Sequence, residues 1–273
     1  METSPNIFSI RVICAEEQTN NCFLSFARCQ PMLQLLYHVL LSRLRISKMP
    51  NRKQVKFFFD VISPYSYFGF EGITRHRTVW KTPIQMKPFF FAGVVRHTEN
   101  PGLPLRVPIK EKYMHKDLLF SAQYWGIPFR LPKDYTNVML NTSSIVPQRI
   151  LVAAQLRDNA LMEDVARALW HRFYAYGKPI FTKSQVAEVL RDLHVKNSDE
   201  LLMMSDSAEV KNILRENTDE AIGNGCFGAP WMHITDNHGK VLQTVFGSDR
   251  LPQVADFLDE PFKGPMREKK QNA

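Results

Sequence analysis

One stretch of the sequence decides the fold: Val55-Lys56-Phe57-Phe58-Phe59-Asp60-Val61-Ile62-Ser63-Pro64-Tyr65-Ser66-Tyr67-Phe68-Gly69-Phe70-Glu71. Its first seven residues are β-rich and mostly apolar, which predicts a buried central strand. Ser63 followed by Pro64 is a helix-start signal, so a helix is expected over 65–80. A second strand is expected around 84–86. The stretch therefore opens a strand–helix–strand unit.

Strand signals return near the other end of the sequence. Residues 231–235 and 240–245 flank the turn sequence Asp236-Asn237-His238-Gly239. This pattern predicts a hairpin with a four-residue connection. A last helix is expected after Ser248 or Asp249, because either side chain can cap it.

The residues between these two units read as helical from 112 to 224. Apolar residues recur at helical spacing over 161–173, and Thr182-Lys183-Ser184-Gln185 has the pattern of a capping box. Residues 92–110 are rich in glycine and proline, which predicts a long loop of the kind that often carries function. The helical block interrupts an α/β unit, so it is an insertion.

A βαβ half followed by a ββα half is the thioredoxin layout, in which the turn before the first helix carries Cys-x-x-Cys. Here that turn reads Ser63-Pro64-Tyr65-Ser66, and its two hydroxyls cannot exchange a disulfide. The layout also places a cis-proline before the returning strand, at Pro230 after Ala229. The predicted class is α/β: a thioredoxin-like domain with an inserted all-helical domain.

The predicted organisation has four parts. Residues 1–54 form an N-terminal extension that can act as a leader. Residues 55–111 and 225–262 together form the discontinuous thioredoxin-like domain, and 112–224 form the helical insertion. Residues 263–273 form a basic tail, expected to be solvated and frayed.

Charge sits mainly at the ends of the chain. The formal net charge is +8, of which residues 1–54 carry +4 and residues 263–273 carry +3. That leaves +1 for the predicted folded body, whereas a nucleic-acid-binding protein concentrates basic residues on its folded surface. We therefore expect no nucleic-acid partner.

Two other classes are disfavoured by the absence of their patterns. The longest apolar stretch, 32–41, is well short of the ~20 residues that a membrane-spanning helix needs, so we expect no membrane insertion. No Cys-x-x-Cys or His-x-x-x-His pair occurs at ligand spacing, so we expect no metal site.

The N-terminal extension has two interpretations. Residues 32–48 are basic and amphipathic, which is typical of an organelle transit signal, although Glu2, Glu16 and Glu17 are acidic where such signals avoid acid. The other interpretation is that the functional chain begins at Met49 after a variable leader. The last three residues do not match the Ser-Lys-Leu type of peroxisomal signal.

The Ser63 turn suggests binding of an anion. A helix N-terminus presents free N–H groups that favour negative charge, and a thiolate supplied by a small molecule would fit beside a hydroxyl. The alternatives are that Ser63 is only a helix cap and that Pro230 is only a strand-entry proline.

Three motifs together resemble a known family. They are 60–71, Phe227-Gly228-Ala229-Pro230 and Phe246-Gly247-Ser248-Asp249-Arg250. In this order, from about 55 to 265, the sequence resembles the kappa class of glutathione transferases. These belong to a thioredoxin-like group that includes bacterial 2-hydroxychromene-2-carboxylate isomerases.

The resemblance implies a role for individual residues. Ser63 matches the catalytic serine, whose hydroxyl faces the glutathione sulfur. Asn100 matches an asparagine in Gly-x-x-x-x-x-x-Asn that contacts glutathione, and Lys110 matches a lysine near the glycine end of the tripeptide. The remaining implied contacts are Pro64 and Tyr65 beside the turn, Ala229 and Pro230 through their backbone, and Ser248 and Asp249 at the γ-glutamyl end. Family members often have Leu in place of Ala229.

The resemblance also implies an activity. Glutathione is the expected co-substrate, with no other cofactor, and it is transferred to a small electrophile; reduction of an organic hydroperoxide is a second expected activity. The implied assembly is a homodimer, and the implied compartment is the mitochondrion, with the peroxisome or cytosol as alternatives. The rival functions are a glutathione-dependent isomerase of the 2-hydroxychromene-2-carboxylate type and a non-catalytic thioredoxin-like binding protein.

Overall fold

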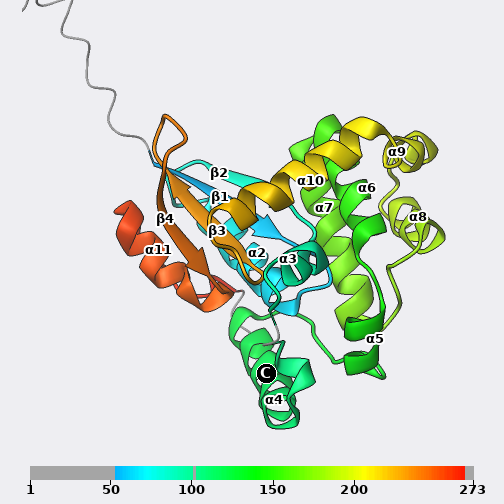
Figure 1. Cartoon of the computed structure of the whole chain (residues 1–273), viewed down its shortest axis with the longest axis horizontal. Coiled ribbons are helices and arrows are strands. Elements are labelled where there is room, and N and C mark those ends of the chain that lie inside the picture. Colours follow the sequence, from blue (N-terminus) through cyan, green and yellow to red (C-terminus); the bar gives the residue numbers. More distant parts are fainter. Residues whose placement is uncertain (1–52, 101–102, 268–273) are drawn as a thin grey trace, which may run out of the picture. The chain divides into compact units, whose positions relative to one another are not determined.

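The computed structural model describes residues 53–100 and 103–267. A four-stranded sheet lies at the centre of this part, in the order β2-β1-β3-β4 (Figure 1). The strands are β1 (Gln54–Phe59), β2 (Ile84–Pro88), β3 (Trp231–Thr235) and β4 (Val241–Phe246). β1 pairs in parallel with β2 and antiparallel with β3, and β3 pairs antiparallel with β4. The predicted thioredoxin-like fold class is confirmed.

Alternating phenylalanines of β1 serve the two faces of the sheet. Phe57 and Phe59 belong to a core with α2 (Pro64–His76) and α11 (Leu251–Leu258). Phe58 belongs to a second cluster with α3 (Phe91–His97) and α10 (Ala208–Gly223). Successive side chains of a strand point to opposite faces, so helices cover β1 on both sides. This explains why its sequence is an almost continuous apolar run.

The inserted block is helical, as predicted. It contains α4 (Pro108–Trp125), α5 (Tyr135–Asn141), α6 (Ile145–Arg157), α7 (Asn159–Trp170), α8 (Lys183–Asp192) and α9 (Ser198–Met204) before α10 returns to the sheet. Trp170 at the end of α7 packs 5.5 Å from the ring of Phe59 and 5.0 Å from that of Phe70. The insertion and the sheet therefore share one core, and the described residues belong to one compact unit. The capping box of Thr182 and Gln185 is present at the start of α8.

The long loop expected over 92–110 is wrong in part. It contains most of α3, a 3₁₀ turn over Pro104–Arg106 and the start of α4. Two of the prolines that suggested a loop, Pro104 and Pro108, instead stand at the first positions of these helices, where a missing N–H breaks no hydrogen bond. Val94 is buried, which anchors α3 against the sheet.

Two other expectations at the C-terminal end are corrected. Ser248 and Asp249 lie in a 3₁₀ turn, and α11 has Arg250 at its N-cap position with no side-chain capping bond. Residues 263–267 are docked rather than frayed, because the Pro265 carbonyl accepts a hydrogen bond from Arg75 (2.9 Å) and the Lys263 N–H donates one to His76 (3.1 Å).

The predictions for residues 1–52, including the leader and the transit signal over 32–48, lie outside the described residues. Among the residues that are described, no helix combines the length and the apolar character needed to cross a membrane.

Candidate functional site

The site begins where β1 ends and α2 starts. Ser63 is the N-cap of α2, with extended backbone, and its Oγ accepts a hydrogen bond from the Ser66 N–H at 3.1 Å. Pro64 follows at the first helical position. The capping role considered from the sequence is therefore real, although it does not exclude a second role for the same hydroxyl.

Two segments far apart in the chain meet at this turn. The Ala229–Pro230 peptide bond is cis, as the layout predicts, and Ser63 Oγ donates to the Ala229 carbonyl at 3.4 Å. The Pro230 carbonyl accepts from the Gly247 N–H at 3.1 Å, which brings the next two residues to the same edge. Of these, Ser248 is buried and Asp249 is exposed.

Asn100 joins the same neighbourhood through the backbone. Its side-chain amide donates to the Phe227 carbonyl at 2.9 Å, two residues before Ala229. Sequence spacing alone cannot predict this contact, because it joins residues 127 positions apart.

A cavity of about 530 Å³ opens beside the turn, between α3, α5 and the residue preceding Ser63. Its wall includes Ile62, Asn100, Arg96 and Arg106. The volume is in the range that suits a small ligand. Sequence reasoning did not identify these two arginines as site residues. Both fall within 92–110, which was expected to be a loop, so no helical face could be assigned to them.

Lys110 and Tyr65 lie around a different cavity, of about 420 Å³, with Ile109 and Tyr113 of α4. The Tyr65 hydroxyl donates to Asp117 at 2.7 Å. Burial, together with this bond and the charge of Asp117, raises the pKa of Tyr65. Lys110 is exposed on the first turn of α4 and does not line the cavity that contains Asn100.

A buried carboxylate supports the turn from below. Asp60 is fully buried and accepts hydrogen bonds from the Ile62 N–H (3.0 Å), the Phe91 N–H (2.9 Å) and the Ser144 hydroxyl (2.7 Å). Burial raises its pKa to about 6, and the three hydrogen bonds oppose that rise. Asp60 thereby ties the start of α3 and the start of α6 to the residues just before Ser63.

Two more buried side chains fix the same backbone. Gln148 donates to the Phe59 carbonyl (2.9 Å) and the Phe89 carbonyl (2.7 Å), and the Tyr174 hydroxyl donates to the Ile62 carbonyl at 2.6 Å. Sequence reasoning identified none of the three supporting side chains, Asp60, Gln148 and Tyr174. The signal available for one of them was the position of Asp60, a carboxylate at the end of an apolar strand.

The described part of the chain has no group of three or more histidine, cysteine, aspartate or glutamate side chains that could hold a metal ion. The geometry instead combines a helix start, a hydroxyl and a cis-proline segment, as expected for binding of a thiol-containing peptide.

Comparison with known proteins first identifies the domain family to which the chain belongs. Residues 54–259 match the DSBA-like thioredoxin domain family. The structure is also similar to that of a 2-hydroxychromene-2-carboxylate isomerase, with a TM-score of 0.60 and 22% identity over 75% of this chain and 94% of that one. At this identity the likeness shows the fold alone.

Sequence relatives narrow the class. The chain is 94% identical over 225 residues to glutathione S-transferase kappa 2 of Caenorhabditis elegans, covering 82% of this chain and 100% of that protein. It is 33% identical over 222 residues to glutathione S-transferase kappa 1 of Homo sapiens, covering 80% and 96%. Within the DSBA-like thioredoxin domains, the chain belongs to the kappa class of glutathione S-transferases.

Proposed function

We propose that this chain transfers the thiolate of glutathione to small electrophiles, with Ser63 as the group that stabilises the thiolate. The observation that carries the proposal is the position of the Ser63 hydroxyl, at the start of α2 and facing the carbonyl of Ala229. Among the described residues of the Ser63–Ser66 turn, Ser63 is the one whose hydroxyl is hydrogen-bonded to the cis-proline segment.

Glutathione would lie along the cis-proline segment. Its backbone pairs with the backbone of Ala229 as an added strand would, which directs its sulfur toward the start of α2. Asp249 suits the ammonium group, and Ser248 suits the γ-glutamyl carboxylate. Asn100 suits the remainder of the tripeptide. Lys110, which lines the neighbouring cavity with Tyr65 and not the one that contains Asn100, suits the carboxylate at the glycine end.

The Ser63 hydroxyl changes partner when glutathione binds. Its bond to the Ala229 carbonyl is 3.4 Å long, which is weak for an O–H donor, so a thiolate is the better acceptor. A free thiol has a pKa near ~8.5, and one charge-assisted hydrogen bond worth roughly 1.5–3 kcal/mol lowers it toward neutral pH. The thiolate then forms a C–S bond as the leaving group departs with the electron pair of the bond that breaks.

The second substrate would enter from the side of α4. The cavity of about 420 Å³ is lined by Tyr65, two residues after Ser63, and by Lys110, and its apolar walls include Ile109, Tyr113 and Met114. These walls suit an apolar electrophile. An organic hydroperoxide is a second acceptor. The thiolate attacks its terminal oxygen, an S–O bond forms as the O–O bond breaks, and the alkoxide takes a proton and leaves as an alcohol. The resulting glutathione sulfenic acid reacts with a second glutathione to give glutathione disulfide and water.

The test is a pair of variants with a matched control. Ser63→Ala should still bind glutathione, but conjugation to an aryl halide at pH 7 should fall about ten- to a hundredfold, with partial recovery at alkaline pH. Ser66→Ala, which removes a buried hydroxyl of the same turn, should change the rate little. Asp249→Ala should lose the thermal stabilisation by glutathione, about 2.7 kcal/mol at 100 times Kd.

The outcomes separate the roles of Ser63. If Ser63→Ala lowers the melting temperature but leaves the rate and its pH profile unchanged, the serine is only a helix cap and the mechanism is wrong. If no variant or wild-type protein is stabilised by millimolar glutathione, the binding site itself is wrong. An isomerase assay run in parallel tests the rival activity.

The proposal also covers the cellular compartment of the protein. We infer a mitochondrial location from the family resemblance and the basic, amphipathic sequence over 32–48. Tagging the intact chain at its C-terminus tests it, and the deletion of residues 1–48 should abolish import. Exclusive peroxisomal or cytosolic signal would contradict the inference.

A further inference from the structure

A second large cavity lies on the other side of α3. It has a volume of about 820 Å³ and is formed by α3, α6 and α10. This volume lies in the range of sites that enclose small molecules. It does not include Ser63, Asn100 or any residue of the cis-proline segment, although it shares Arg96 with the cavity beside the Ser63 turn.

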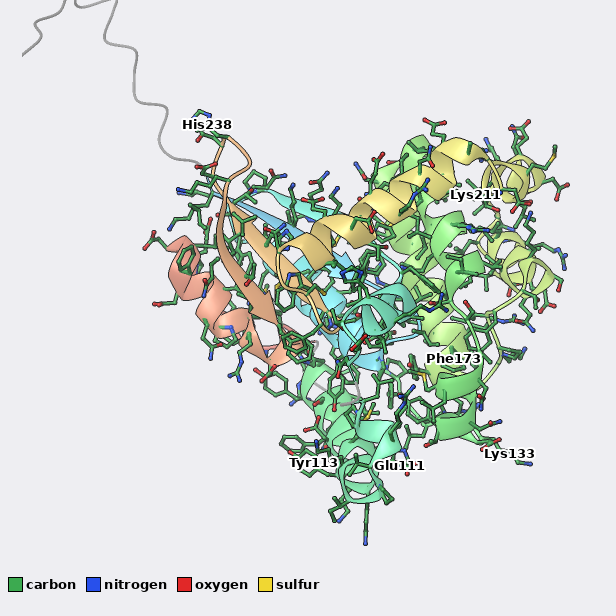
Figure 2. The ribbon with its side chains drawn as sticks, in the orientation of Figure 1. Glu111, Tyr113, Lys133, Phe173, Lys211 and His238 are labelled. Atoms are coloured by element: carbon green, nitrogen blue, oxygen red, sulfur yellow. The ribbon has the colours of Figure 1, made fainter. Side chains whose placement is uncertain are left out.

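The cavity is strongly basic. Arg96, Arg149, Lys211 and Arg215 line it, and Asp219 is the one carboxylate among the residues that do so. These cations come from three different helices, α3, α6 and α10, and line one cavity, whereas the basic residues of a solvated face usually lie along a single helix. Figure 2 shows Lys211 on α10.

These cations lack close carboxylate partners in the part of the chain that the structure describes. Within the described residues, none of the four has an ion pair within 4.0 Å. The Arg149 Nε is buried and has no hydrogen-bond partner there. The nearby carboxylate of Asp206, which feels the charges of Arg149 and Lys211, is already bonded to Lys183. A buried guanidinium N–H without an acceptor is costly, and an anion in the cavity would remove that cost.

The rest of the wall is apolar. Phe90, Ile145 and Ile222 contribute half-buried side chains, and the buried Leu214 of α10 also lines the cavity. A small inorganic anion would leave this surface in contact with water. We propose that the cavity binds an amphipathic organic anion, in which a carboxylate or phosphate head group meets the cations and an apolar body covers Phe90, Ile145, Leu214 and Ile222.

Arg96 also lines the cavity beside Ser63, so it is unsuitable for a clean test. Lys211 and Arg149 line only the basic cavity among the cavities described above. Lys211 is exposed, so Lys211→Gln should fold normally, and Arg149→Gln keeps a polar side chain at the partly buried position. Arg191 on α8, which has no ion pair among the described residues and lies outside this cavity, provides the charge-matched control Arg191→Gln.

The experiment is calorimetric titration of the full chain with decanoate and with decyl phosphate, below their critical micelle concentrations. Inorganic phosphate and decanol serve as probes of the head group and of the apolar body alone. Decanoate or decyl phosphate should bind, and whichever binds more tightly identifies the head group. Lys211→Gln and Arg149→Gln should each weaken binding about three- to tenfold, while Arg191→Gln should not.

Three results would overturn the proposal: no binding of either amphipathic anion, equal binding by all variants, or binding of decanol or inorganic phosphate as tight as that of the anions. Glutathione conjugation by Lys211→Gln is measured in parallel and should be unchanged. The two proposals can therefore fail independently.

Discussion

The buried side chain of Asp60 links the stability of this protein to pH. Its carboxylate is fully buried under the Ser63 turn, and its three hydrogen bonds come from two backbone N–H groups and the Ser144 hydroxyl. Burial nevertheless raises its pKa from 3.8 to about 6. The folded state therefore holds this proton more tightly than the unfolded state does.

The sign of the effect follows from this difference. A raised pKa in the folded state contributes stability that is full below about pH 3.8 and is lost as pH rises through about 6. The contribution lost is about 3 kcal/mol, at 1.36 kcal/mol for each pH unit. We expect denaturant unfolding of wild type and Asp60→Asn to show this difference in slope between pH 4 and 6.

The comparison of the two proteins isolates Asp60 from the buried His233. Burial lowers the pKa of His233 to about 4, so its titration makes stability rise with pH, but this contribution is the same in both proteins and cancels in the difference. The stability of wild type relative to Asp60→Asn should fall by up to about 3 kcal/mol between pH 4 and 6, because only wild type has this carboxyl group to deprotonate. Parallel stability curves for the two proteins would contradict the raised pKa.

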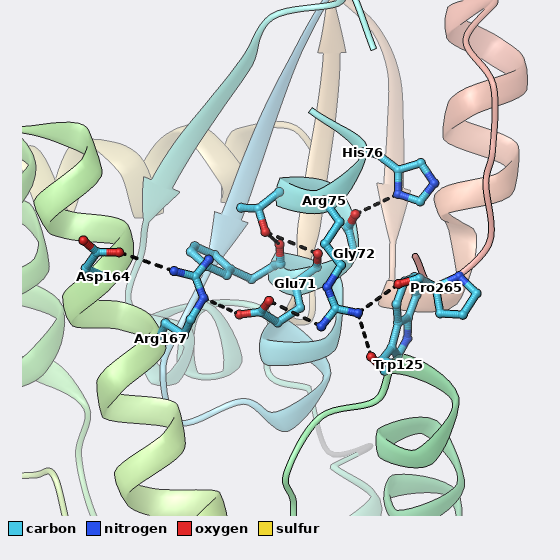
Figure 3. A network of polar contacts seen from close by, with 10 residues as sticks. Glu71, Gly72, Arg75, His76, Trp125, Asp164, Arg167 and Pro265 are labelled. Atoms are coloured by element: carbon cyan, nitrogen blue, oxygen red, sulfur yellow. Dashed lines mark hydrogen bonds and ion pairs between the residues drawn. The ribbon is translucent and has the colours of Figure 1, made fainter. Parts of the chain in front are cut away.

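At the scale of the element, α2 is held in place by close packing and by charge. A Cβ at Gly72 would lie 2.5 Å from Leu251 of α11 and 2.7 Å from Trp125 of α4. Beside it, Glu71 lies between Arg75 and Arg167, as Figure 3 shows, and accepts from the Arg167 Nε at 2.7 Å. Arg75 in turn donates to the Trp125 carbonyl at 2.6 Å. These contacts fix the helix whose first turn carries Ser63.

Gly72→Ala is expected to destabilise the protein. Alanine is the better helix former by about 1 kcal/mol, but the close contacts require α2 or the side chains of Leu251 and Trp125 to shift, at a cost of about 1–3 kcal/mol. Gly223→Ala at the end of α10 is the matched control, because a Cβ there would meet nothing within 4 Å, and it should be neutral or stabilising. A stabilised Gly72→Ala would mean that α2 is not tightly packed. The free energy of unfolding in urea measures both.

The same elements show what the sequence could predict. The apolar run of β1, the Ser63–Pro64 start of α2 and the hairpin at 236–239 are local signals, and each prediction was confirmed within a few residues. The loop over 92–110 was wrong because proline was read as a helix breaker, whereas Pro104 and Pro108 begin helices. Local pattern does not distinguish these two uses of proline.

The site was less predictable, because it is assembled from distant segments. Ser63 and the cis-proline could be placed by the order of the strands. By contrast, the contact of Asn100 with Phe227 and the support of Ile62 by Tyr174 depend on how the insertion packs on the sheet. Lys110, assigned by resemblance alone, lies on a different cavity from Asn100.

At the scale of the whole molecule, α4 carries an unusual surface. Its buried residues, Met114, Leu118, Ala122 and Trp125, lie on one side. The opposite side carries exposed Ile109, Tyr113, Phe120 and Tyr124, at spacings of four, seven and four residues that keep them on one helical stripe. Figure 2 shows Tyr113 on the outside of this helix. Contiguous exposed apolar side chains of this kind mark surfaces that another protein covers.

We propose that this stripe is part of the interface of the homodimer that the family resemblance implies. The wild-type protein should have a dimeric mass by sedimentation velocity at micromolar concentration. Phe120 is 71% exposed, so Phe120→Glu should leave the fold intact but bury a charge in the interface, weakening association by at least about tenfold. Met203 on α9 is 75% exposed and lies outside the stripe, so Met203→Glu should stay dimeric. A monomeric wild type would overturn the dimer. A dimeric Phe120→Glu protein would instead move the interface away from α4.

Because Ile109 and Tyr113 also line the cavity next to Tyr65, a dimer formed through this stripe would bring the partner subunit close to the proposed entrance for the electrophile. The dissociated variant should then show an altered KM for the electrophile while its binding of glutathione is retained.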